Sequence, residues 1–148
     1  MAIYTNSVMN AIYTTLSSNQ TIVNCGVLVE QYAIDNTDPN KTPWINVLDP
    51  EIAIVGRRLN ISEPWMETIN VTIKCQVQNY QNIEEQYLAV RELNDLRDNV
   101  WSAVNSNRTL DNTVHIITGF QMARVNIDQT QSDDFLESQL VLTAEVFA

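Results

Sequence analysis

The stretch TINVTIKCQVQ, residues 68–78, alternates without exception between polar and apolar side chains. Successive side chains of a β-strand point to opposite faces of its sheet. The stretch therefore predicts a strand with one face in the core and one polar face. A shift of the pairing by one residue would exchange these faces, so the pattern also specifies the register. The core-facing residues are expected to be Ile69, Val71, Ile73, Cys75 and Val77.

Residues 81–105, directly after this strand, predict a long helix. Apolar side chains recur at three- and four-residue steps along one stripe, and charged side chains occupy the opposite side, the pattern of a helix that lies on a sheet. The stripe comprises Ile83, Tyr87, Val90, Leu93, Val100, Trp101 and Val104.

Arg97 falls near the centre of that apolar stripe and is its one exception. Its aliphatic stem can lie on the apolar surface while the guanidinium reaches solvent or an internal carboxylate. The alternative is a salt bridge to another subunit, which makes Arg97 a candidate interface residue.

Residues 4–16 predict a first helix, since apolar positions again follow helical spacing. Its opposite face carries no charge and several poor helix formers, so tertiary or quaternary packing is expected to support it. This face is a candidate subunit interface, represented by Ser7, Asn10 and Thr14.

Further strands are predicted on both sides of the central one. Residues 25–34, 44–48 and 52–59 are rich in Val, Ile and aromatic residues. Residues 114–127 and 135–146 predict a long C-terminal β-hairpin, with a bulge near Arg124, where the apolar phase switches. Helix, strands, helix and hairpin follow one another without repeated βαβ units, so the fold class is α+β with a mainly antiparallel β-sheet.

The composition is that of one folded domain spanning residues 1–148. Eighteen acidic and eight basic residues leave a net charge of −10, which disfavours direct binding to nucleic acid. Cys25 and Cys75 lack metal-binding or redox spacing and are expected to be buried, reduced thiols. The uncharged first 29 residues have neither the basic start nor the apolar run of a signal peptide or membrane span, so neither is expected.

The sequence offers no set of residues that suggests catalysis. His115, the single histidine, lies among apolar residues of a predicted strand. Phosphate-binding loops, nucleophile elbows and metal-binding helices have no counterpart in the sequence. We therefore expect no catalytic residues, no cofactor and no metal, and a protein that is not an enzyme.

The order of these elements resembles the tail terminator proteins of long-tailed bacteriophages, which belong to the wider group of tail completion and head-tail joining proteins. The matching features are the first helix, the strand PWINV at 43–47, the strand at 69–77, the helix at 84–104 and the last strand at 136–146. The resemblance implies a sheet packed by two α-helices and a hexameric ring. It also implies a virion protein, assembled in the host cytoplasm, whose partners are further copies of itself, the tail tube protein and the head connector or stopper protein.

Further residues become candidates once a ring is considered. An exposed Trp44 or Trp65 could anchor a subunit interface, although a position in the core is the simpler alternative. The acidic tip of the hairpin, with Asp128, Asp133 and Asp134, is a candidate channel lining, where negative charge would let DNA pass without binding. The simpler alternative is a solvated loop.

Three competing functions remain open at this point. A head completion (stopper) protein would also be small and ring-forming. A host-directed adaptor protein would suit an acidic surface without an active site. An enzyme would need a pocket with converging reactive groups.

Overall fold

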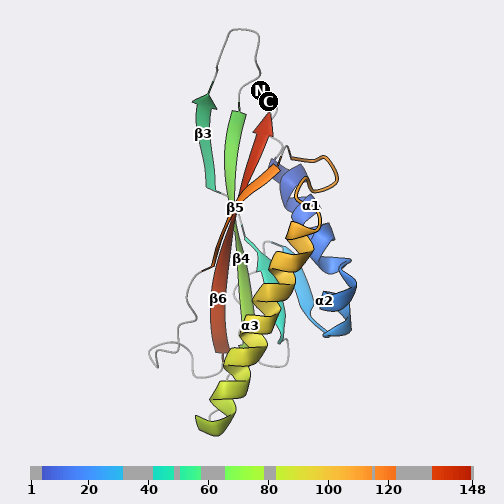
Figure 1. The fold of residues 1–148 in the computed structure, drawn as a ribbon, viewed down its shortest axis with the longest axis vertical. Coiled ribbons are helices and arrows are strands. Elements are labelled where there is room, and N and C mark those ends of the chain that lie inside the picture. Colours follow the sequence, from blue (N-terminus) through green and yellow to red (C-terminus); the bar gives the residue numbers. More distant parts are fainter. Residues whose placement is uncertain are drawn as a thin grey trace.

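The computed structural model describes residues 5–31, 42–48, 51–57, 66–78, 83–114, 116–122 and 135–147. These residues form a layer of helices packed on one face of a twisted sheet (Figure 1). The elements, in chain order, are α1 (Thr5–Ser17), α2 (Gln20–Asn24), β1 (Leu28–Gln31), β2 (Trp44–Val47), β3 (Glu51–Arg57), β4 (Met66–Gln78), α3 (Ile83–Asn105), β5 (Ile116–Met122) and β6 (Phe135–Phe147).

The sheet is mainly antiparallel, with strand order β1-β2-β4-β6-β5 and with β3 also paired to β4. Only the pair of edge strand β1 and β2 is parallel among these pairings. Strands β4 and β6 pair along their whole lengths, from Met66 opposite Phe147 to Gln78 opposite Phe135. The α+β class and the antiparallel sheet are thus confirmed.

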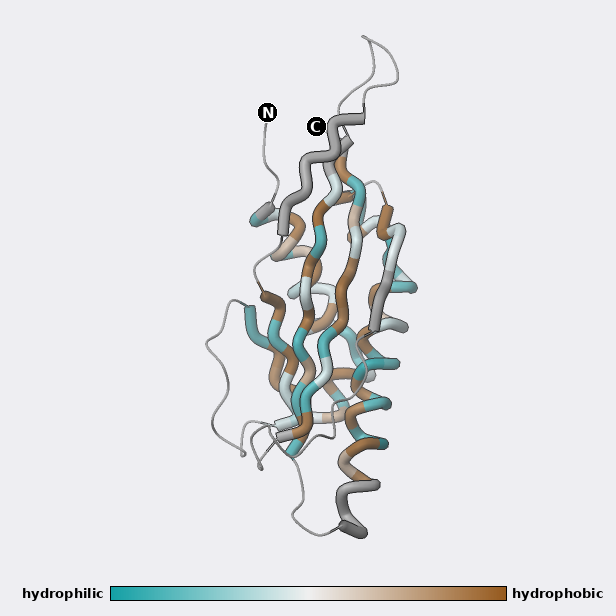
Figure 2. Tube along the Cα trace, turned by 90° about the vertical axis from the view of Figure 1, so that its left-hand side faces the viewer, coloured by the Kyte–Doolittle hydropathy of each residue, from teal (hydrophilic) through white to brown (hydrophobic). Residues whose placement is uncertain are grey.

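The alternation in β4 divides the sheet into two chemically different faces, and the bands of hydropathy along the central strands follow it (Figure 2). Each of the predicted core residues of β4 is buried on the face that the helices cover. The pairing places the apolar residues of β6 beside them, so two strands contribute to one apolar surface. These β6 residues are Leu136, Leu140, Leu142, Ala144 and Val146.

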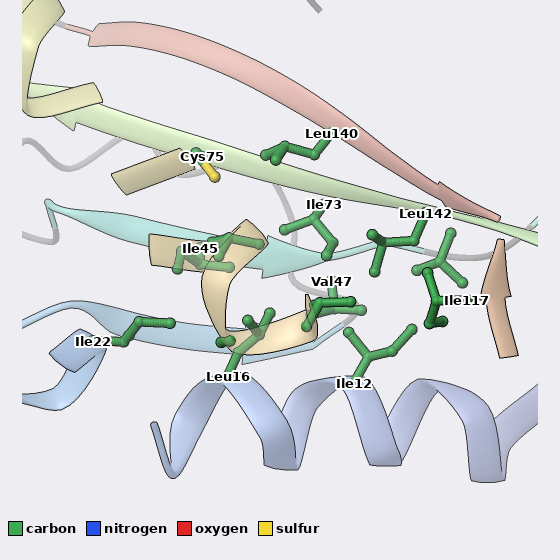
Figure 3. Packing of buried hydrophobic residues seen from close by; sticks show 14 of the residues in the cluster. Ile12, Leu16, Ile22, Ile45, Val47, Ile73, Cys75, Ile117, Leu140 and Leu142 are labelled. Carbon is green, nitrogen blue, oxygen red and sulfur yellow. The ribbon is translucent and has the colours of Figure 1, made fainter. Parts of the chain in front are cut away.

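Helices α1 and α3 cover this apolar surface. Figure 3 shows Ile12 and Leu16 pointing from α1 toward the side chains of the sheet. From α3, Leu93 and Val100 are fully buried in the same cluster. Burial of one such aliphatic side chain stabilises the fold by about 1.5–3 kcal/mol. The two predicted helices therefore form because the sheet offers them a surface to bury.

The strand predicted from residue 25 begins only at Leu28, after a short helix α2 that the sequence analysis did not predict. Asn19 caps this helix, since its side-chain oxygen accepts a hydrogen bond from the backbone N–H of Ile22 at 3.2 Å. Gly26, at a φ of +70°, then turns the chain into β1, which starts only at Leu28. Positive φ is readily available to glycine. A helix of five residues is fixed by its cap and turn, which explains why apolar periodicity missed it.

The C-terminal hairpin pairing is confirmed, because β5 runs antiparallel to β6. The register shifts between Ile117 and Gly119, where Thr118 is the extra residue. Glycine suits the position after the shift, since a Cβ on Gly119 would lie 3.3 Å from the side chain of Thr143. The bulge predicted near Arg124 and the acidic tip at 128–134 lie outside the described residues.

Candidate functional site

The outer face of α1 presents the uncharged surface that the sequence predicted. Ser7, Asn10 and Thr14 are all exposed, while the opposite side of the helix is buried against the sheet. These three side chains are polar and uncharged, so they would not repel a second acidic copy of the chain by charge. Its contact with a neighbouring subunit remains a prediction.

Trp44 is not an exposed interface anchor, which corrects that expectation. Its side chain is 1% exposed. β2 lies between β1 and β4 in the sheet, and all four of its residues are buried. Trp65 lies outside the described residues, as do His115 and the acidic tip residues Asp128, Asp133 and Asp134.

Arg97 is half-buried and has partners within its own chain. Its guanidinium donates hydrogen bonds to Ser138 Oγ on β6 at 3.1 Å and to Asn94 Oδ1 on α3 at 2.9 Å. Partners within the chain are therefore observed for Arg97, among them a hydroxyl and an amide oxygen. A salt bridge from Arg97 to another subunit remains untested.

The two cysteines occupy different environments. Cys75 is buried beneath α3, and burial raises the pKa of its thiol to about 12, against the opposing charge of Arg97. Cys25, in contrast, is exposed, so the expectation of two buried thiols is wrong for this residue. The turn after α2 places Cys25 at the surface. Both cysteines are free thiols.

The sheet face opposite the helices carries a buried polar cluster that sequence reasoning missed. Lys74 Nζ lies 3.0 Å from Glu137 Oε1, and the same carboxylate oxygen accepts a 2.8 Å hydrogen bond from Gln76 Nε2. Asn46 on β2, opposite Lys74 in the register, is fully buried. The alternation in β4 puts Lys74 and Gln76 on one face, but only the pairing with β6 brings Glu137 to them.

A surface groove of about 320 Å³ lies between the corner formed by α2 and β1 and the outer side of α3. Its lining combines apolar side chains with two acidic residues and one basic residue. The residues are Cys25, Val27, Pro43, Leu88, Arg91, Glu92, Asp95, Leu96 and Asn99. Partial burial raises the pKa of the Glu92 carboxyl above its ordinary value. This groove is a concave surface formed by residues of α3 and of the segment around α2 and β1.

Within the described ranges, no group of three or more His, Cys, Asp or Glu side chains could hold a metal ion. In the same part of the chain, no helix has the length and apolar character required to cross a membrane.

The fold has a counterpart among solved structures. No protein-family model and no curated protein matches the sequence. A chain in a structure described as the virion of a native gene transfer agent (GTA) particle matches with a TM-score of 0.55 at 11% sequence identity. The match covers 99% of this chain and 100% of that chain. The two chains thus share a fold over their whole lengths.

Proposed function

We propose that this chain is a structural protein of a phage-like virion and acts there as a tail terminator. The observation that carries the proposal is the likeness in fold to a chain of the gene transfer agent virion, which covers 99% of this chain and 100% of that chain. The order of elements, which resembles the tail terminator family, gives independent support. The proposed location is the head-tail junction.

The proposed mechanism is steric. Copies of the chain form a hexameric ring, and one face of this ring binds the last ring of the tail tube. Because that contact covers the surface that would recruit the next tube ring, polymerisation stops. The other face of the ring then binds the head connector or stopper protein. No covalent step is needed.

Ring formation requires head-to-tail contacts between different surfaces of neighbouring subunits. The outer face of α1, with its exposed Ser7, Asn10 and Thr14, is a candidate for one of these surfaces. The net charge of −10 suits a channel through which DNA passes without specific binding. In this proposal the acidic tip, with Asp128, Asp133 and Asp134, faces or approaches the channel.

Addition of the purified protein to polymerising tail tube protein tests the function. We expect tubes to stop elongating and to carry extra density at one end in electron micrographs. A matched sample with filled heads serves as the comparison. Binding to heads without any effect on tubes would contradict tail termination and favour a stopper protein instead.

A further inference from the structure

We propose that the groove beside α3 binds a segment of a partner protein in which a lysine or arginine adjoins an aliphatic residue. The inference goes beyond tail termination and does not depend on it. The groove has a volume of about 320 Å³. Ligand pockets range from about 300 to 1,000 Å³, so this groove is of a size for a few side chains and not for a folded domain.

The apolar part of the lining comes from two segments of the chain. On α3 the lining residues recur at three- and four-residue steps, so they share one face of the helix. Within this face Leu96 is only 4% exposed, whereas Leu88 is 55% exposed. Val27 and Pro43, both half-buried, add apolar surface from the segment around α2 and β1. Apolar surface with polar side chains around it is typical of a protein contact.

The charge of the groove favours a basic occupant. Glu92 and Asp95 stand against Arg91 in the lining, which leaves an acidic excess. Partial burial disfavours the charged form of Glu92 and raises its pKa. A cation brought into the groove would offset this effect by stabilising the carboxylate.

The charge of the whole chain favours a different protein over a second copy in this groove. Two copies that each carry a net charge of −10 repel one another, whereas a basic partner is attracted by the groove and by the rest of the chain. The partner is therefore expected to be a basic protein, or a protein with a basic segment.

A lysine or arginine beside an aliphatic residue meets both requirements of the lining. The cationic head can reach the carboxylates of Glu92 and Asp95, while the methylene stem lies on apolar surface. The adjoining aliphatic side chain can cover the exposed Leu88. Neither a purely apolar nor an acidic segment would satisfy both parts of the groove.

Selection from a random heptapeptide library with the full-length protein tests this specificity. We expect the enriched peptides to carry Lys or Arg next to Leu, Ile or Val. Fluorescence anisotropy then measures the affinity of one such peptide for Asp95→Lys, which we expect to bind about tenfold more weakly, because an attractive charge becomes a repulsive one. Asp98→Lys is the matched control, since Asp98 is exposed on α3 but does not line the groove, and it should bind like the wild type.

A second pair of variants tests the apolar part of the groove. Leu88→Gln keeps a good helix former but removes the apolar surface, and we expect about fivefold weaker binding. Val23→Gln is its control, because Val23 is similarly exposed on α2 but does not line the groove. Urea unfolding of each variant separates loss of folding from loss of binding. If Asp95→Lys unfolds, Asp95→Asn with Asp98→Asn as its control answers the same question.

Several results would overturn the proposal. Enrichment of acidic or purely apolar peptides, or no enrichment at all, contradicts the stated specificity. Equal weakening by Asp95→Lys and Asp98→Lys would show that the acidic chain attracts basic peptides without using the groove. Unchanged binding by Leu88→Gln would remove the apolar contact. Release of the bound peptide as the protein concentration rises would assign the groove to a second copy instead.

Discussion

At the scale of single residues, Glu137 has the largest predicted effect on stability. Its Oε1 atom accepts from both Lys74 and Gln76 in a cluster whose side chains are mostly buried. Glu137→Leu leaves the Lys74 ammonium without this carboxylate, and we expect a loss of about 3 kcal/mol in the free energy of unfolding, measured with urea. The double variant Lys74→Met, Glu137→Leu should recover most of it, because no buried charge is then left without its counterpart. Equal losses in the single and double variants would contradict this explanation.

At the scale of elements, α2 depends on its cap. The side chain of Asn19 accepts from the Ile22 N–H, and Ile22 is fully buried in the core. Asn19→Ala removes this acceptor and is expected to lower the free energy of unfolding by about 1 kcal/mol. Asn10→Ala, at an exposed position within α1, is the matched control and should cost nothing, since alanine favours a helix interior. A control as unstable as Asn19→Ala would show that the cap is not the cause.

At the scale of the whole molecule, the outer face of α1 can be tested for a role in assembly. Asn10→Glu with Thr14→Glu adds two negative charges to an exposed face of an already acidic chain. If this face meets a neighbouring subunit, like-charge repulsion should abolish ring formation on tail tubes while the urea midpoint stays near that of the wild type. Asn10→Gln with Thr14→Ser keeps the face uncharged and should preserve the ring. Normal rings from the charged variant would exclude this face from the interface.

The sequence by itself determined the local structure that periodicity encodes. The alternation at residues 68–78 set the two faces of β4, and the apolar stripes of the two long helices set which sides they bury, because these patterns repeat with the geometry of each element. Tertiary structure decided everything that joins distant segments. Tertiary packing buried Trp44 on β2, the pairing of β4 with β6 brought Glu137 to Lys74, and the turn after α2 exposed Cys25 beside α3 in the lining of the groove. No local pattern records such contacts, since they arise only when the chain closes on itself.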